Sequence, residues 1–288
     1  MRIFILLFIT FSITAQDIVW THNSPIIRTF SSIRTTDLNN DNIDDIIIGG
    51  GVDGYPTPYG IIAVDGVSGD NLWNVTTRNE MFTTPQFFDY NNDNIDDIVI
   101  GGRDAELRLI NGVNGDVIWE FWDENDGDPN DEGWYNFYTS QIIDDQTGDG
   151  VPDILTSNGG DHSLDFSETD RPPGHIMIID GMTGELFKLA VVPDSNETYM
   201  SPIIYDLNQD SNLTIIFGTG GESVEGNLWI TTLQDLLNED ITNATPLISN
   251  SSLGYIAPPS IADLNLDGVL DIITQGFDGK ITVINGED

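Results

Sequence analysis

The chain has no cysteine and few basic residues or histidines. Its 288 residues include 9 lysines and arginines and 3 histidines, against 48 aspartates and glutamates. Without cysteine the chain has no disulfide framework, and bound metal can supply stabilising cross-links instead. The formal net charge of −39 argues against nucleic acid as a partner, because phosphates require lysine and arginine. It also argues against electrostatic docking on anionic lipid.

Long apolar runs are also scarce. Residues Met1 to Gln16 contain Arg2, an apolar run from Ile3 to Ile13 and the small residues Thr14-Ala15. This pattern is typical of a secretory signal peptide cleaved after Ala15, with a retained anchor as the alternative. No later stretch approaches the roughly 18 apolar residues of a membrane-spanning helix. We therefore expect a signal peptide over residues 1–16 and one secreted domain over residues 17–288.

One acidic stretch recurs five times and organises the chain. Its first copy, DLNNDNIDDIIIGG, is an acidic loop followed directly by an apolar run. The copies begin at Asp37, Asp89, Asp145, Asp206 and Asp263, so successive copies lie 52, 56, 61 and 57 residues apart (37→89→145→206→263). A period of about 50 residues indicates a repeat architecture, and propeller blades have periods of this size.

The side chains of each loop have the chemistry of a calcium site. Oxygen-bearing side chains occupy positions 1, 3, 5 and 9, and position 7 can offer its backbone carbonyl, which matches the hard oxygen ligands that Ca²⁺ prefers. An EF-hand is excluded because the twelfth position is Ile48 instead of a bidentate Glu and because strands, not helices, flank the loop. A metal-free Asx-rich turn is the alternative, and five copies in register favour calcium. The proposed ligands are Asp37, Asn39, Asp41, Ile43, Asp45; Asp89, Asn91, Asp93, Ile95, Asp97; Asp145, Thr147, Asp149, Val151, Asp153; Asp206, Asn208, Asp210; and Asp263, Asn265, Asp267, Val269, Asp271.

The five copies differ in strength. The first, second and fifth carry Asp-x-Asn-x-Asp-x-x-x-Asp in full, and the third has Thr147 in place of the Asn. The fourth ends on Thr214 and so loses a charged ligand. We expect about four or five structural calcium ions, with the fourth site weakest or empty.

The loops resemble the calcium loops of FG-GAP (VCBS-type) repeats, the blades of the integrin alpha-chain propeller. The resemblance covers nearly all of the chain after residue 16 and implies a β-propeller with calcium between the first and second strands of each blade. The stretches Ala63 to Trp73 and Leu109 to Trp119 also resemble the tryptophan-docking hairpins of quinoprotein propellers, which implies that these tryptophans pack between blades. The third copy keeps Asp180 and Gly184 but has Lys188 at the tryptophan position.

We therefore predict an all-β fold, a β-propeller of about five four-stranded blades. Blade one is expected to contain strands at Ser32 to Asp37, Asp45 to Gly49, Gly60 to Asp65 and Asn71 to Thr76. The other blades are expected at Pro85 to Trp122, Thr139 to Val192, Ser201 to Ile248 and Pro259 to Gly286. Asp17 to Thr21 resembles a stray fourth strand that would complete blade five and close a five-bladed ring. The alternative, which we favour, is a fragment of a larger ring, such as one of seven blades.

Strand alternation predicts that the metal loops share one face of the propeller and that the long connections share the other. The long connections are Gly50 to Gly60, Trp122 to Tyr138 and Asn158 to Gly174. Because loops on a rigid scaffold carry recognition, ligand-face candidates are Trp122, Trp134, Tyr135, Tyr138 and His162. Aromatic rings beside carboxylates suit polysaccharide or a protein partner. The alternative is a solvated acidic loop whose aromatics pack on the adjacent blade.

Catalysis has little support in the sequence. The chain has no GxSxG, HExxH, P-loop or dinucleotide motif in a usable context, and His162 is expected to be a solvent-facing loop residue. We expect a secreted calcium-binding module that binds an extracellular polysaccharide or protein. The alternatives are an extracellular carbohydrate-active enzyme, such as a polysaccharide lyase on a propeller scaffold, and an outer-membrane assembly or scaffold propeller.

Overall fold

A computed structural model describes residues 18–24, 28–121, 134–161, 164–165, 168–250 and 252–286. The predicted signal peptide lies outside these ranges, as do Trp122 and His162. Within the described ranges, no helix has the length and apolar character needed to cross a membrane.

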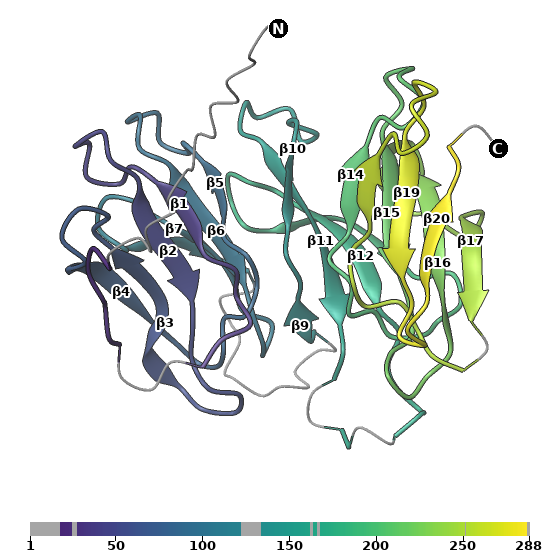
Figure 1. The fold of residues 1–288 in the computed structure, drawn as a ribbon, viewed down its shortest axis with the longest axis horizontal. Coiled ribbons are helices and arrows are strands. Elements are labelled where there is room, and N and C mark those ends of the chain that lie inside the picture. The colour runs from purple at the N-terminus through teal and green to yellow at the C-terminus, as the bar shows by residue number, and fades with distance from the viewer. Residues whose placement is uncertain are drawn as a thin grey trace, which may run out of the picture.

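Five antiparallel sheets follow one another along the chain (Figure 1), and they confirm the predicted all-β propeller architecture. Blade one contains β1 (Arg34–Thr36), β2 (Asp45–Gly49), β3 (Thr57–Val64) and β4 (Asn71–Thr77). Blade two contains β5 (Gln86–Phe88), β6 (Asp97–Gly101), β7 (Leu107–Ile110) and β8 (Val117–Glu120). Blade three contains β9 (Asn136–Phe137), β10 (Gln141–Ile143), β11 (Asp153–Gly159), β12 (His175–Ile179) and β13 (Leu186–Val191). Blade four contains β14 (Ile203–Tyr205), β15 (Thr214–Gly218), β16 (Gly226–Thr232), helix α1 (Leu233–Leu237) and β17 (Thr245–Asn250), and blade five contains β18 (Ser260–Ala262), β19 (Asp271–Gln275) and β20 (Ile281–Ile284).

The second strand of each blade forms the core of its sheet. These strands are short runs of Ile, Val and Leu, which suit a strand covered on both faces. Every residue of β6, β11 and β15 is buried. In β2, burial alternates, with Ile47 fully buried and its neighbours Ile46 and Ile48 only half-buried. The difference arises because only one face of blade one packs against another described sheet.

Consecutive blades pack through four apolar clusters. Ile47 of blade one packs with Ile98 of blade two, and Leu109 of blade two packs with Ile154 of blade three. The same arrangement joins blade three to blade four and blade four to blade five. Burial of these β-branched and Leu side chains, worth about 1.5–3 kcal/mol each, holds the sheets in order.

The sheets form an open arc, which excludes the closed five-bladed ring for this structure and agrees with the favoured alternative, part of a larger ring. Blade one and blade five lie at opposite ends of the molecule (Figure 1), and no apolar cluster among the described residues joins them. In the described part of the chain, β20 pairs only with β19. Residues 18–22 form no strand and contact blade one instead, where the Trp20 indole donates to the Gly66 carbonyl at 3.0 Å.

Three elements differ from the sequence prediction. Strand β3 begins at Thr57, inside the connection expected to end at Gly60, and its pairing with β4 is irregular between Thr57 and Ile61. Strand β9 adds an extra pair to β11. Helix α1 replaces the turn of blade four, and Thr232 and Asp235 form a capping box at its start.

Candidate metal loops

All five predicted metal loops lie between the first and second strands of their blades. In Figure 1 the strands β2, β11 and β19 point downward, so the loops that precede them lie along the upper edge. The loops span residues 37–45, 89–97, 145–153, 206–214 and 263–271. The turn that follows the third strand lies on the same side, so the metal loops of blades one, two, three and five each lie next to the turn of their own blade.

The loops share one backbone conformation. In each of them the fourth and sixth residues have positive φ, which only Gly, Asn and a few other residues adopt readily. The pairs are Asn40 and Asn42, Asn92 and Asn94, Gly148 and Gly150, Gln209 and Ser211, and Leu266 and Gly268. Left-handed residues at alternate positions keep the turn tight, and in the first, second and fifth loops the Asn oxygen at position 3 accepts from the backbone N–H of position 5.

The first and fifth residues of each loop, both Asp, hold this turn through backbone hydrogen bonds. Oδ2 of Asp37 accepts from the Asn42 N–H at 2.8 Å, and Oδ1 of Asp41 accepts from the Ile43 N–H at 2.8 Å. The same two contacts recur in the other four loops, at 2.8–3.0 Å. Each carboxylate oxygen has a second lone pair, so these contacts leave acceptor capacity for a cation.

The ninth-position Asp is buried and connects the loop to the hairpin turn. Asp45 is 0% exposed; its Oδ2 accepts from the Leu38 N–H and its Oδ1 from the Gly66 N–H, both at 2.9 Å. Asp97, Asp153 and Asp271 repeat both contacts, with the loop at 2.6–3.0 Å and with Gly112, Gly181 and Gly286 at 2.9–3.3 Å. The sequence pattern predicted this Asp only as a metal ligand and did not indicate its connection to the hairpin turn.

The hairpin turn in turn receives a tryptophan from the preceding segment, as the quinoprotein-like hairpins implied. The Trp73 indole donates to the Gly112 carbonyl at 2.8 Å, and the Trp119 indole donates to the Gly181 carbonyl at 2.9 Å. Both rings are 7% exposed. Gly184 lies directly against the Trp119 ring with φ of +76°, and a Cβ there would be 2.6 Å from a ring carbon.

Blade four lacks this arrangement altogether. Thr214 replaces the ninth-position Asp, and α1 replaces the Asp-Gly turn. Lys188, which stands where the docking tryptophan would come from, lies near Glu239 at 3.4 Å instead. The joint loss of Asp and turn glycine is the signal in the sequence that could have revealed their contact.

The electrostatics of the loops are those of clustered carboxylates without basic partners. Among the described residues, no Lys or Arg forms an ion pair with a loop Asp. Burial raises the pKa of Asp97, and the carboxylates of Asp93 and Asp89 raise it further. At the loop surface, the backbone N–H groups of Gly148 and Gly150 lower the pKa of Asp145.

The donor set fits Ca²⁺ by its chemistry. The described residues contain no cluster in which three or more His, Cys, Asp or Glu side chains could hold a metal by themselves. Each complete loop, however, also offers an Asn side-chain oxygen and a backbone carbonyl, so its donors are all oxygens. Ca²⁺ takes 6–8 such ligands and accepts irregular geometry and water in the remaining positions.

The aromatic side chains predicted for the ligand face pack into the protein where they are described. Tyr138 is 8% exposed, and its ring contacts Phe82 at 5.6 Å and Tyr199 at 6.2 Å. Burial raises its pKa well above the usual range. Phe82, Tyr138 and Tyr199 each precede the first Asp of their loop by seven residues, so this position repeats and belongs to the blade interfaces.

Trp134 and Tyr135 are half-buried at the same edge of the molecule. The Trp134 ring packs on Phe121 at 5.5 Å and on His175 at 5.9 Å. The Tyr135 backbone N–H donates to Asn158 at 2.9 Å. Trp134 and Tyr138 therefore pack against neighbouring blades, and the burial of the Tyr138 ring speaks against its assignment to the ligand face.

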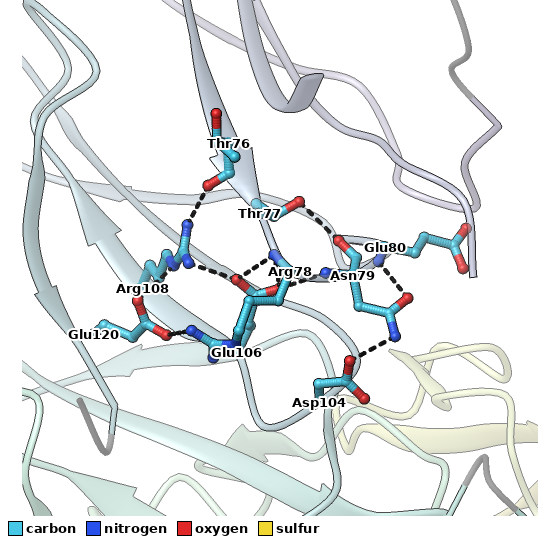
Figure 2. A network of polar contacts seen from close by, with 9 residues as sticks. All are labelled: Thr76, Thr77, Arg78, Asn79, Glu80, Asp104, Glu106, Arg108 and Glu120. Atoms are coloured by element: carbon cyan, nitrogen blue, oxygen red, sulfur yellow. Dashed lines mark hydrogen bonds and ion pairs between the residues drawn. The ribbon is translucent and has the colours of Figure 1, made fainter. Parts of the chain in front are cut away.

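Two polar networks on this face were not predicted. Arg171, whose side chain is 7% exposed, contacts Glu197 at 3.3 Å and donates to the Asp165 carbonyl at 2.8 Å, which anchors the third long connection. Between blades one and two, Glu106 is fully buried, accepts from the backbone N–H groups of Arg78 and Asn79, and pairs with Arg108 at 2.6 Å (Figure 2). Its burial raises the pKa of the Glu106 carboxyl, and the nearby arginines oppose that shift.

No protein-family model matches the chain, and no curated protein matches it in sequence. Among solved structures, it is similar to a quinohemoprotein alcohol dehydrogenase from Pseudomonas putida HK5, with a TM-score of 0.55 and 12% identity over 92% of this chain and 41% of that one. A quinohemoprotein alcohol dehydrogenase from Comamonas testosteroni gives a TM-score of 0.50 and 14% identity over 84% of this chain and 40% of that one. BamB from Moraxella catarrhalis gives a TM-score of 0.48 and 15% identity over 92% of this chain and 62% of that one.

The chain therefore spans 40–62% of the length of these three structures. At such low identity, the likeness concerns the fold and not the activity. Together with the five sheets and their order of packing, it identifies the chain as a β-propeller.

Proposed function

We propose that this protein is a secreted recognition module whose β-propeller is stiffened by calcium ions in the loops that begin at Asp37, Asp89, Asp145 and Asp263. We further propose that it belongs with the FG-GAP (VCBS-type) propellers. The proposal is for a binding protein with structural metal, not for an enzyme. Its ligand is an extracellular polysaccharide or protein, bound on the face opposite the metal loops.

The observation that carries this proposal is the fivefold repetition of one loop conformation built from oxygen donors. Carboxylates crowded at the loops, in a chain with a net charge of −39, repel one another and loosen the compact state. In a complete loop the residues at positions 1, 3 and 5 and the carbonyl at position 7 would hold the ion. The ninth-position Asp, also predicted as a ligand, would hold the loop against the hairpin turn, as Asp45 does through the Leu38 and Gly66 N–H groups. Bound calcium supplies positive charge and rigid cross-links at those oxygens.

Removal of calcium should lower the melting temperature. A single site saturated at one hundred times its dissociation constant adds about 2.7 kcal/mol, which for a domain of this size is roughly 5–10 °C. The measurement is a thermal melt followed by circular dichroism after EDTA treatment, then after excess CaCl₂. A melting temperature that responds to neither addition refutes structural calcium.

The loops should contribute unequally. Asp93→Ala removes a ligand from a complete loop, whereas Asp210→Ala removes one from the loop that already lacks the ninth-position Asp. The calcium-induced rise in melting temperature should therefore fall more in Asp93→Ala than in Asp210→Ala. Equal losses would show that the ranking of the loops is wrong.

The recognition role is tested separately from the metal. Purified protein is screened for binding to an array of polysaccharides and glycans, with calcium and with EDTA. Binding that requires calcium, with no change in the chain length of the bound polysaccharide, supports a recognition module. Shortening of the polysaccharide would instead support the carbohydrate-active enzyme.

A further inference from the structure

We propose that Asp45, Asp97 and Asp153 are positioning residues that transmit calcium binding in a loop to the tryptophan docked on the same blade. The inference rests on the proposed calcium sites. It adds that calcium controls the contact between neighbouring blades, in addition to the stability of each loop. Calcium would thus act on the interface of two blades from a loop that belongs to one of them.

Each of these carboxylates forms a bridge between two turns. In blade two, Oδ2 of Asp97 accepts from the Tyr90 N–H at 3.0 Å, and Tyr90 directly follows the first metal-loop residue, Asp89. Oδ1 of Asp97 accepts from the Gly112 N–H at 2.9 Å. The position of Asp89 is therefore linked to the position of Gly112 through one rigid, buried carboxylate that is 1% exposed.

The hairpin turn completes the connection. The carbonyl of Gly112 accepts the indole N–H of Trp73 at 2.8 Å, and Trp73 belongs to β4 of the preceding blade. A carboxylate that ligates a cation near Asp89 fixes the loop backbone, which fixes the Tyr90 N–H and through it Asp97. Hydrogen bonds to a charged acceptor are short and strong. A shift of the loop backbone on calcium binding should therefore move Asp97 and, with it, the Gly112 N–H.

The arrangement occurs three times. Asp45 links Leu38 to Gly66, which receives Trp20 at 3.0 Å. Asp153 links Gln146 to Gly181, which receives Trp119 at 2.9 Å. The link from metal loop through Asp to the tryptophan-binding turn is therefore a repeated feature of the blades and not a peculiarity of one loop.

The chain contains two natural comparisons. Blade five keeps the bridge, with Asp271 contacting Leu264 at 2.9 Å and Gly286 at 3.3 Å, but within the described residues no tryptophan donates to Gly286. Blade four has no bridge, and its Trp229 indole donates to Thr219 at 3.1 Å within the same blade. Asp271 is therefore the control for substitution of a bridging Asp. Trp229 is the control for a tryptophan that is not connected to a metal loop.

The test uses the full chain labelled with 5-fluorotryptophan, with the ¹⁹F resonances assigned by Trp→Phe substitution. Calcium is added to protein treated with EDTA. We expect calcium to shift and sharpen the resonances of Trp20, Trp73 and Trp119 and to leave that of Trp229 in place. Asp97→Asn should abolish the response of Trp73 and preserve that of Trp119, and Asp271→Asn should preserve all three.

Equilibrium dialysis with radioactive calcium on the same samples separates this inference from the proposed function. If the wild-type protein binds no calcium, both fall. If it binds calcium but Trp73 and Trp119 respond no more than Trp229, only the coupling is overturned, and this comparison needs no variant to fold. Retention of the Trp73 response in Asp97→Asn, with calcium bound, also overturns the coupling.

Discussion

The docking of one tryptophan on one glycine gives the sharpest test of the blade interfaces. In Gly184→Ala, the new methyl group would lie 2.6 Å from a carbon of the Trp119 ring. The ring cannot withdraw freely, because its indole N–H donates to the Gly181 carbonyl at 2.9 Å and because it is 7% exposed. The substitution therefore has to displace either the tryptophan or the hairpin turn.

The expected cost has two parts. Gly184 has a φ of +76°, and placing an L-residue in that conformation costs roughly 1–2 kcal/mol. Overpacking against the ring adds about 1–3 kcal/mol, so the total is about 2–5 kcal/mol. Gly279→Ala is the matched control, because Gly279 has a φ of +83° and no neighbouring atom within 4 Å of the point where its new methyl group would lie. Gly279→Ala should therefore lower the free energy of unfolding only by the backbone cost of roughly 1–2 kcal/mol.

The assay is equilibrium unfolding in urea with calcium present, followed by circular dichroism, for each variant alone and in a Trp119→Ala background. Removing the ring should eliminate the overpacking, so Gly184→Ala should cost only about 1–2 kcal/mol in that background. If Gly184→Ala is no more harmful than Gly279→Ala, or if its cost is unchanged without Trp119, the proposed contact is not what constrains the glycine.

Two further predictions concern the face opposite the metal loops. Tyr138→Ala should destabilise the protein by about 3–5 kcal/mol, because the ring is 8% exposed, whereas Tyr55→Ala, at a site 67% exposed, should be nearly neutral in the same urea titration; equal costs would contradict the burial of Tyr138. Burial lowers the pKa of His175 below its ordinary value of 6.5, so the unfolded chain takes up the proton first and stability falls as the pH drops below 6.5. Melting curves between about pH 7.5 and 5.5 should show a smaller loss for His175→Leu than for wild type, and parallel losses would refute the assignment.

The parts of the fold that could be predicted were those written in local, repeated patterns. Five acidic loops followed by Ile-rich or Val-rich runs predicted the second strands closely, as Asp45 to Gly49 shows for β2. The resemblance to quinoprotein docking hairpins implied that Trp73 and Trp119 pack between blades, and both indoles donate to a turn of the next blade. Repetition supplied information that a single loop lacks.

The parts that could not be predicted depend on contacts between distant residues. Glu106 and Arg108 resemble ordinary alternating strand residues, and only the approach of the 78–79 backbone makes them a buried network. Tyr138 was grouped with its acidic, aromatic neighbours, although its register with Phe82 and Tyr199 placed it at a blade interface. The stretch containing Trp20 was expected as a fourth strand that would complete blade five, but residues 18–22 form no strand and the Trp20 indole contacts blade one.

The docking tryptophans are made before the turns that receive them. Trp73 contacts a turn 39 residues later in the chain, and Trp119 contacts one 62 residues later. Proteins are made from the N-terminus at about 5–20 residues per second, so each indole remains without its acceptor for several seconds on the ribosome. Blades one and two therefore each keep one aromatic ring uncovered until the next blade has been made, and a pause in synthesis within that interval leaves an apolar surface exposed to other nascent chains.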